Sequence, residues 1–481
     1  MSALSGSRKS GRPHRVAPTK GQRPVMKTSV NRRQFIQFAG LAVFGWQPQS
    51  QLGAGYSQPG PKPTALSLTP GRASSGNTSD KPNIILIMAD DIGYECFGCY
   101  GGTSYETPVL DELARTGVRF EHCYSQPLCT PSRVKIMTGQ YNFRNYVDFG
   151  VLDPKQKTFG HLLQGAGYAT CVVGKWQLYG SVNQRAEVRG TGSLPSDAGF
   201  DEHCLWQIME RGSRYKDPLM IRNGEPVEDF EGRYGPDISC DYALDFIERH
   251  EAEPFFLYFP MAIVHDPFVP TPDSEDWDKP KHKNNTKYFP DMVAYMDKMV
   301  GRIVDKLEEL GLRSNTLVLF IGDNGTHKSI KSELAGRIIQ GNKGETTDAG
   351  THVPFIANQP GTVASGNVCG DLVDFSDFVP TFAELTGAEA PEGMIMDGRS
   401  FLPQLRGEKG NPKEWIFCHY DPRWGKWKQV KRFVRDKRWK LYANGDLYDI
   451  PADTLEQNPN PTGREAAEAR KRLQVILDSI K

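Results

Sequence analysis

Four segments of the chain are continuously apolar and end in charged or polar residues. They are the runs 84–88, 255–259 and 317–321, and the segment YATCVVGKW, which contains Lys175. An apolar run without polar alternation is typical of a strand that is buried on both faces, as in a parallel sheet. Helical patterns lie between these runs, so the chain predicts strands alternating with helices.

The most regular helical pattern lies between residues 291 and 310. Its apolar side chains recur at three- and four-residue steps, at Met292, Tyr295, Met299, Ile303 and Leu307. That spacing places them on one face of a helix. We therefore expect an α/β fold, with a large, mainly parallel sheet sandwiched by helices, in a catalytic domain of about 81–400.

The last part of the chain, about 412–481, predicts a small C-terminal α+β subdomain. The segments WIFCHY, VKRFVRDKRWKLYAN and DLYDI indicate strands of an antiparallel sheet. An amphipathic helix is expected over about 465–481, and the apolar residues that would pack inward are Leu473, Ile476, Leu477 and Ile480.

The beginning of the chain has the pattern of an export signal. Paired arginines, Arg32 and Arg33, precede a short apolar run at 38–46. This run is too short to span a bilayer, and a twin-arginine pair before it indicates a Tat-type signal peptide at 1–54. Met26 gives a more usual signal length and is a second candidate start. The alternative is a disordered basic tail.

Export by the Tat machinery would place the protein in a bacterial periplasm or outside the cell. Residues 55–80 are rich in Gly, Ser, Pro and Thr and predict a linker. The rest of the chain contains no candidate transmembrane segment, so no stable membrane span is expected.

Charge and cysteine content change this picture little. The formal net charge is +0, but residues 1–33 contain nine Lys and Arg, which leaves 49 basic and 58 acidic residues, a net of −9, for the remainder. A weakly acidic body does not favour nucleic acid as a partner. Nine cysteines are an odd number, and no pair of CxxC motifs with zinc spacing occurs.

Candidate chemistry lies at the ends of two apolar runs. Asp90 and Asp91 follow the first run, and Asp323 and Asn324 follow the run at 317–321. In an open α/β sheet, ligands bind at the carboxyl ends of the strands, so these side chains should gather in one crevice. Oxygen ligands without His or Cys favour a hard cation, calcium or magnesium. The alternative is that they are ordinary helix caps and turn residues.

Positive charge can be brought to the same crevice by three side chains, Arg133, Lys175 and Lys343. Each of them taken singly is more often a solvated surface charge. Together with a divalent cation, they indicate a tetrahedral anionic substrate, a sulfate or a phosphate ester.

The segment QPLCTPSRVKIMTG raises the question of what Cys129 does. Cys129, Pro131 and Arg133 form a C-x-P-x-R motif, followed by Thr138 and Gly139. With NIILIMADDIG, GKWQL, VHDPFVP, GDNGTH, GNKG and RDKRWKLYANGDLYDI in order, the chain resembles the formylglycine-dependent (type I, arylsulfatase-like) sulfatases. That family belongs to the alkaline phosphatase-like superfamily. The resemblance extends from about residue 83 to the C-terminus.

This resemblance implies a specific nucleophile. In the family, a maturation enzyme oxidises the cysteine of C-x-P-x-R to Cα-formylglycine, so Cys129 would be an aldehyde precursor. One hydroxyl of the hydrated aldehyde attacks sulfur and displaces the alcohol. Deprotonation of the second hydroxyl then expels sulfate and restores the aldehyde.

The resemblance also implies roles for the other residues. Asp90, Asp91, Asp323 and Asn324, with the modified residue 129, would hold calcium in preference to magnesium. Arg133 would stabilise the modified side chain, and Lys175 and Lys343 would bind sulfate oxygens. His265, in VHDPFVP, would contact the ester and protonate the leaving oxygen.

One departure from the family pattern concerns the release step. The family usually reads G-K-W-H-L, whereas Gln177 follows Gly174-Lys175-Trp176 here. Glutamine can hydrogen-bond a hydroxyl but cannot take its proton at ordinary pH. His327, in GDNGTH, is a candidate replacement base, and a substrate-contact or surface role is as well supported. TDAGTHVP also departs from the Glu-Gly-Gly that the family often has.

The expected function is therefore removal of sulfate from an ester, on a sulfated carbohydrate by family habit. The nearest alternative is a phosphomonoester, phosphodiester or phosphonate hydrolase on the same scaffold. A more distant one, which Gln177 suggests, is a protein that binds sulfated glycan without turning it over.

Overall fold

The computed structural model describes residues 81–279, 281–425 and 429–480 of the 481-residue chain. The predicted signal peptide and linker, at 1–54 and 55–80, lie outside the described residues. Among the described residues, no helix is long and apolar enough to cross a membrane.

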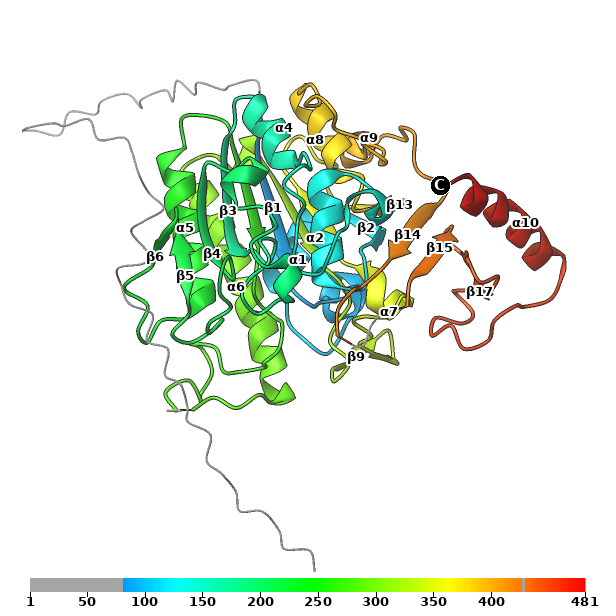
Figure 1. Ribbon diagram of the computed structural model, residues 1–481, viewed down its shortest axis with the longest axis horizontal. Helices are drawn as coiled ribbons and strands as arrows, with labels where there is room; N and C mark the ends of the chain where they lie inside the picture. The colour runs from blue at the N-terminus through cyan, green and yellow to red at the C-terminus, as the bar shows by residue number, and fades with distance from the viewer. Residues whose placement is uncertain (1–80, 280, 426–428, 481) are drawn as a thin grey trace, which may run out of the picture. The chain divides into compact units, whose positions relative to one another are not determined.

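A large mixed sheet forms the centre of the described part of the chain, with the strand order β11-β2-β12-β8-β1-β7-β3-β4-β5-β6, and with β13 paired to β2 (Figure 1). Its strands are β1 (Asn83–Ala89), β2 (Val118–Tyr124), β3 (Ala169–Lys175), β4 (Glu202–Trp206), β5 (Met220–Arg222), β6 (Glu225–Pro226), β7 (Phe255–Pro260), β8 (Thr316–Gly322), β11 (His352–Val353), β12 (Phe355–Asn358) and β13 (Asn367–Asp374). The four apolar runs of the sequence are thus β1, β3, β7 and β8, and they are parallel neighbours at the centre of the sheet, continued by β4.

Helices cover both faces of this sheet, α1 (Pro108–Thr116), α5 (Gly235–Arg249) and α6 (Phe289–Glu309) on one, and α2 (Cys129–Thr138), α4 (Phe159–Gly165), α8 (Phe378–Thr386) and α9 (Leu402–Leu405) on the other. Two short helices, α3 (Asn142–Asn145) and α7 (Asp348–Thr351), lie in the connections. Alternate residues of β1 enter different cores, because successive side chains of a strand point to opposite faces. Ile85 and Ile87 pack with residues of α1, α5 and α6, whereas Leu86 and Met88 pack with α2, α4 and α8.

The helix predicted at 291–310 is present as α6, with its apolar stripe buried against β1. The sandwiched, mainly parallel sheet is therefore confirmed. A hairpin of β9 (Lys331–Leu334) and β10 (Arg337–Gln340) stands apart from it.

The end of the chain forms the expected separate antiparallel sheet. Its strands are β14 (Ile416–Tyr420), β15 (Lys431–Arg435), β16 (Trp439–Tyr442) and β17 (Leu447–Asp449), and α10 (Arg464–Ser479) packs on it. Leu473 and Leu477 of α10 are buried against Val434 and Leu441 of this sheet. Figure 1 shows β14 and β15 lying between the large sheet and α10.

Candidate active site

Two acidic pairs meet because the strands that carry them are neighbours. β1 and β8 are parallel and in register from Asn83 opposite Thr316 to Ala89 opposite Gly322. The next residue of each strand is an aspartate, so Asp90 and Asp323 leave the sheet at the same edge. The backbone N–H of Asp91 donates to Asp323 Oδ1 at 3.0 Å, and Asn324 Nδ2 donates to Asp91 Oδ1 at 2.9 Å.

Part of this acidic group has no partner in the described part of the chain. Asp323 Oδ2 and Asn324 Oδ1 are buried and accept no hydrogen bond. Burial, reinforced by the charge of Asp90, raises the pKa of Asp323 well above its ordinary value. Buried polar atoms normally have a partner, so two orphaned oxygens that face the same acidic group fit an oxygen-liganded cation. Asp90, Asp323 and the Cys129 sulfur also lie close enough to share an ion.

Two lysines enter the same edge from other elements. Lys175 ends β3, which is parallel to β7, itself the parallel neighbour of β1. Its Nζ donates to both oxygens of Asp90, at 2.9 and 2.7 Å. Lys343, from the loop before α7, donates to Asp91 Oδ2 at 2.5 Å. Although burial raises the pKa of Asp90, Lys175 and Arg214 lower it, and it stays below the ordinary value.

Cys129 reaches the site at the first turn of α2. The strand β2 runs in the same direction as β8, because β12 lies between them and is antiparallel to both. The helix after β2 therefore begins at the edge where the acids lie. Cys129 is its first residue, is only 2% exposed, and its Sγ donates to Gln177 Oε1 at 3.3 Å. Burial raises the pKa of the Cys129 thiol.

Arg133 lies one turn further along α2 and ties the helix to the end of β3. Its Nη1 donates to the carbonyls of Lys175 and Trp176, at 2.6 and 2.8 Å. Those contacts hold the chain just before Gln177, whose φ of 54° is left-handed. The preceding strand residue, Gly174, cannot carry a side chain, because a Cβ would lie 2.2 Å from the Pro260 carbonyl oxygen.

The two predicted histidines are placed differently. His265 Nδ1 contacts the Asp266 carbonyl at 2.5 Å, and its Nε2 lies 3.0 Å from Lys343 Nζ and 3.5 Å from Asp91 Oδ2. Burial, with the nearby charges of Arg214 and Lys343, lowers the pKa of His265 well below its ordinary value. Because a carbonyl can only accept and an ammonium can only donate, Nδ1 donates to Asp266 and Nε2 accepts from Lys343, which fits an uncharged ring.

His327 lines the same cavity as Cys129, and its Nδ1 is 2.8 Å from Ser329 Oγ.

Arg214 is a site residue that sequence reasoning missed. It lies in the loop after β4, is buried, and its Nη1 lies 3.5 Å from Asp90 Oδ2. Its guanidinium also covers the Trp206 ring, 4.4 Å from the centroid. No local motif surrounds it in the sequence, so only the folding of the loop reveals its position.

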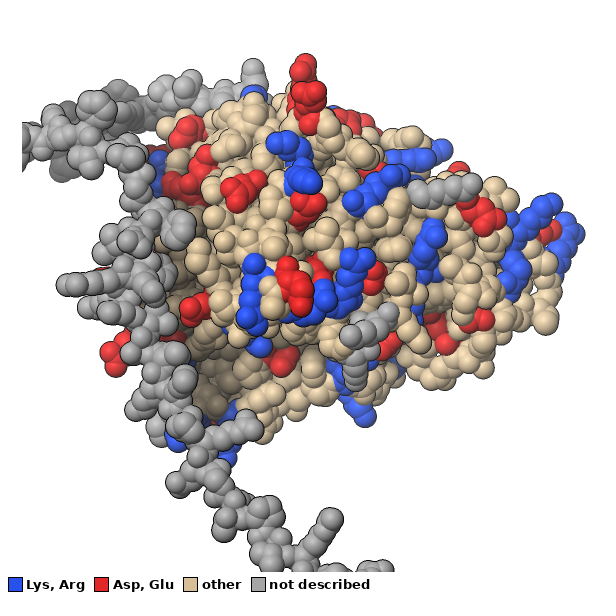
Figure 2. Space-filling view, in the orientation of Figure 1, with Lys and Arg blue, Asp and Glu red and all other residues tan. Residues whose placement is uncertain are grey.

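The site opens into a cavity of about 420 Å³. Two loops far apart in the chain meet at its wall, where Trp424 stacks on Phe149 with ring centroids 4.5 Å apart. Trp424 is 36% exposed and comes from the loop between β14 and β15, so the C-terminal subdomain contributes to the cavity. On the face that Figure 2 shows, basic and acidic side chains are interspersed, and neither sign forms a broad patch.

Comparison with known proteins gives a consistent result. A family model described as sulfatase matches residues 82–388, and one described as the C-terminal part of N-sulphoglucosamine sulphohydrolase matches 343–481. Human arylsulfatase D is 28% identical over 80% of this chain and 77% of its own length. The N-acetylgalactosamine-6-O-sulfatase of Bacteroides thetaiotaomicron is also 28% identical, over 85% of this chain and 94% of its own.

The solved structures agree. A sulfatase structure from work on glycosaminoglycan metabolism by B. thetaiotaomicron superposes with a TM-score of 0.68 and 25% identity, covering 84% of this chain and 99% of its own. The phosphonate monoester hydrolase of Agrobacterium radiobacter, 20% identical with a TM-score of 0.64 over 83% of this chain and 95% of its own, shares the fold. Because the sulfatase model matches well over half of the chain, the chain belongs to the sulfatase family, whose members hydrolyse sulfate esters.

Proposed function

We propose that this sulfatase removes sulfate from a carbohydrate sulfate ester, with residue 129 as Cα-formylglycine and with calcium beside it. The observation that carries the proposal is the meeting of Cys129 with a buried and a part-buried lysine, Lys175 and Lys343, and with an incompletely satisfied acidic group, beside a cavity. A nucleophile, anion-binding cations and a cation site are the parts that sulfate ester cleavage needs.

Conversion of Cys129 is supported by its surroundings. Burial raises the pKa of the thiol, and a thiol without a lowered pKa is a weak nucleophile. As an aldehyde hydrate, residue 129 would offer one hydroxyl to attack sulfur and a second to expel the sulfate from the enzyme. Its place at the first turn of α2 also puts the N-terminal end of the helix dipole next to the anion. A maturation enzyme is the partner this requires.

Calcium is the cation that the donor set fits best. Asp90, Asp91, Asp323 and Asn324 supply oxygens only, and carboxylate and amide oxygens are preferred calcium ligands. Magnesium fits less well, because it keeps several waters and demands a near-octahedral shell, whereas the donors here are packed together and buried. When bound, the cation would neutralise the carboxylates and polarise a sulfate oxygen.

The remaining side chains would position the ester and manage its protons. Lys175 and Lys343 can bind sulfate oxygens by exchanging part of their contact with Asp90 and Asp91. Lys343 Nζ and His265 Nε2 lie 3.0 Å apart, and this pair would supply the proton that the leaving oxygen takes up. Arg133 would keep α2 and the end of β3 in register, since it binds the carbonyls of Lys175 and Trp176.

A carbohydrate leaving group is supported by the cavity wall and by the relatives. The stacked rings of Trp424 and Phe149 offer an aromatic surface of the kind on which sugar rings pack, and Asn183 and Gln184 provide amide groups nearby. Relatives over most of the chain include an N-acetylgalactosamine-6-O-sulfatase. Export by a Tat-type signal at 1–54 to the periplasm or outside the cell would bring the enzyme to such a substrate.

A phosphate or phosphonate ester is the second candidate, favoured by the shared fold with a phosphonate monoester hydrolase. The test uses full-length protein co-expressed with a maturation enzyme, assayed on matched aryl sulfate and aryl phosphate esters and on sulfated sugars. We expect sulfate release to exceed phosphate release, mass spectrometry to find an aldehyde at residue 129, and Cys129→Ala to abolish turnover. Faster phosphate release, full activity of Cys129→Ala, or glycan binding without turnover would overturn the proposal.

A further inference from the structure

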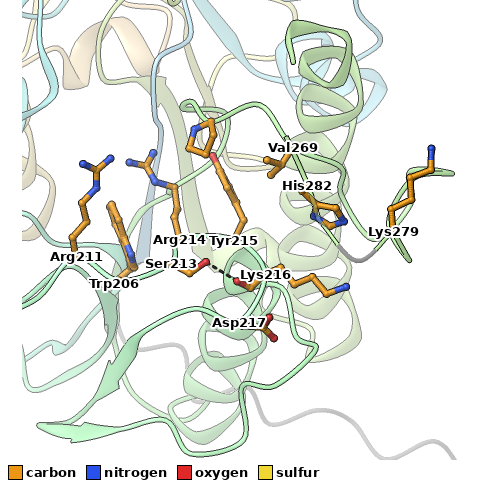
Figure 3. Close-up of a pocket in the computed structure, with 12 residues that line it drawn as sticks. Trp206, Arg211, Ser213, Arg214, Tyr215, Lys216, Asp217, Val269, Lys279 and His282 are labelled. Atoms are coloured by element: carbon orange, nitrogen blue, oxygen red, sulfur yellow. Dashed lines mark hydrogen bonds between the residues drawn. The ribbon is translucent and has the colours of Figure 1, made fainter. Parts of the chain in front are cut away.

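A second cavity, of about 490 Å³, adjoins the one that contains Cys129. Arg211 and Arg214 line both cavities. Residues adjacent in the chain also line the two: Trp206 and Pro267 line the second cavity, and Gln207 and Asp266 line the one with Cys129. Figure 3 shows the guanidinium groups of Arg211 and Arg214 pointing the same way, while Lys216 extends away from them.

The second cavity is lined by more cations than anions. Arg211, Arg214, Lys216 and Lys279 contribute positive charge, and Asp217 is the one carboxylate among the described lining residues. Two of these cations are already paired, Arg214 with Asp90 and Lys279 with Asp276.

Arg211 and Lys216 lack such pairing. No carboxylate in the described part of the chain lies within ion-pair distance of either side chain. Lys216 instead lies over the Trp277 ring, 4.7 Å from its centroid, and 3.5 Å from the Trp277 carbonyl. Asp217 forms no ion pair with either of them, and its Oδ1 accepts a hydrogen bond from the Gly232 N–H at 2.6 Å. Among the described residues, the second cavity therefore has two cations without an ion-pair partner, and its lining has an excess of positive charge.

The loop that carries these cations is fixed by its own hydrogen bonds. Ser213 Oγ donates to the Lys216 carbonyl at 2.6 Å, as drawn in Figure 3, and the Leu219 N–H donates to the Ser213 carbonyl at 3.2 Å. Gly212 has a φ of +54°, and a Cβ there would lie 2.3 Å from Leu219 Cβ, so the turn depends on glycine. The basic side chains thus start from a defined backbone.

The same loop contacts the catalytic residues directly. Arg214 lies against Asp90, and the Tyr215 hydroxyl donates to the carbonyls of His265 and Ala262, at 2.5 and 3.0 Å. An anionic substituent in the second cavity would therefore lie on the other side of Arg214 from an ester at residue 129. That arrangement suits a molecule that spans both cavities.

We propose that the second cavity is an anion subsite, in which the positive charge of Arg211 and Lys216 attracts a second negatively charged substituent, sulfate or carboxylate, of the same saccharide. The inference rests on the proposed function, since it concerns the substrate of that site. The enzyme then selects saccharides with at least two anionic groups over singly sulfated ones.

The test compares three matched saccharides that share one scissile sulfate, using matured full-length enzyme. One has no other charge, one has a second sulfate, and one has a carboxylate. We expect kcat/KM to be about tenfold higher for the two compounds with a second anionic group than for the singly sulfated one. A factor of this size corresponds to one hydrogen bond to a charged group. Whichever of these two compounds has the higher kcat/KM identifies the preferred anion, sulfate or carboxylate. Lys216→Gln and Arg211→Gln should reduce this ratio toward one, whereas Lys471→Gln, on the exposed face of α10, should leave it at the wild-type value.

A binding measurement separates recognition from turnover. In the Cys129→Ala background, which lacks the nucleophile, calorimetry should show about tenfold weaker binding of the disulfated compound after Lys216→Gln. Equal kcat/KM of the wild-type enzyme for all three saccharides would overturn the subsite while leaving the proposed function intact. Failure of the wild-type enzyme to release sulfate from any of them would instead refute the proposed function.

Discussion

Two buried groups of charges lie on either side of α2, and they are built differently. The catalytic cluster consists of Asp90, Asp91, Lys175, Asp323 and Lys343. The Lys413 cluster consists of Lys135, Asp374, Asp377 and Lys413. Cys129 and Arg133 of α2 face the first, whereas Lys135 of the same helix belongs to the second.

Every charge of the Lys413 cluster has a partner of opposite sign. Lys413 Nζ lies 2.7 Å from Asp377 and 3.2 Å from Asp374, and Lys135 Nζ lies 3.2 Å from Asp374. In the catalytic cluster, Asp90 and Asp91 are paired with Lys175 and Lys343. Asp323 has no cation within ion-pair distance among the described residues, and its Oδ2 is buried without a hydrogen bond.

The difference is the one expected between a structural charge cluster and a cluster that binds a ligand. Removing a carboxylate from water costs free energy, and a purely structural site recovers it by pairing every charge. A site that must bind a ligand leaves some of its groups incomplete, because the ligand supplies the missing partner. Burial does not distinguish the two clusters, and an oxygen without a hydrogen bond does not either, because Asp374 Oδ2 is another such atom. The difference is that two lysines lie beside Asp374, whereas none of the described cations lies within ion-pair distance of Asp323.

The same substitution made in both clusters gives the largest expected effect. Asp323→Asn should remove bound calcium and lower kcat by at least about 100-fold, more than the loss typical for a group outside the ligand shell. It should not destabilise the metal-free protein, because it removes an unpaired buried charge. Asp374→Asn should retain metal and turnover but lower stability. Metal analysis, kinetics and denaturant unfolding check the pair, and the comparison fails if both variants lose metal equally.

Breaking the Lys413 cluster from its cationic side should cost stability. Lys413→Met leaves Asp377 buried without its cation, and removing one partner of a buried pair costs about 3–5 kcal/mol of unfolding free energy. The double variant Lys413→Met/Asp377→Asn should recover part of that loss, since no charge is then left uncompensated. Chemical denaturation measures both. If the double variant loses as much unfolding free energy as the two single variants added together, pairing is not the source of stability.

Gln177 lies next to the catalytic cluster at a position where the family usually has a histidine. Kinetics test whether the missing base slows the release of sulfate. Gln177 accepts from Cys129 Sγ but cannot take a proton, so release should be slower than ester cleavage. Rapid mixing should show a burst of alcohol, and Gln177→His should speed the steady phase by about 10²-fold, the lower end for a positioned base.

His327→Ala is the companion variant, and it should slow the steady phase further if His327 is the substitute base. Product formation without a burst, with both variants unchanged, would show that position 177 does not control release.

The smallest expected effect is on the pH dependence of stability, and it comes from His352. Burial lowers the pKa of His352, whereas the pKa of Lys413, despite its burial, is raised by its aspartate neighbours. His352 donates from Nε2 to the Glu121 carbonyl at 2.7 Å, and burial, together with Arg435, lowers its pKa to about 4. The unfolded state therefore binds a proton near pH 6.5 and the folded state only near pH 4, so stability falls as pH falls between these values.

The expected loss from His352 is about 2 kcal/mol between pH 7 and pH 5. His352→Gln should remove that part of the acid sensitivity in urea unfolding measured across this range. An identical pH slope in the variant would show that other groups account for it.

The sequence by itself determined the fold class and the set of candidate chemistry. Apolar runs without alternation predicted β1, β3, β7 and β8, because a strand buried on both faces has no polar side to show in its pattern. The α6 stripe and the C-terminal antiparallel sheet followed from equally local signals, and the C-x-P-x-R motif identified the family. Which of the predicted site residues act in catalysis stays a prediction.

Only the tertiary structure decided how the site is completed. Arg214 reaches Asp90 from an irregular loop, and Trp424 reaches the cavity from the other end of the chain, neither with a local motif. The difference between Asp323 and Asp374 is also tertiary, because each is a strand-end aspartate in the sequence. Pairing depends on which cations other segments bring within a few ångströms, and that distance is set by packing across the sheet rather than by spacing along the chain.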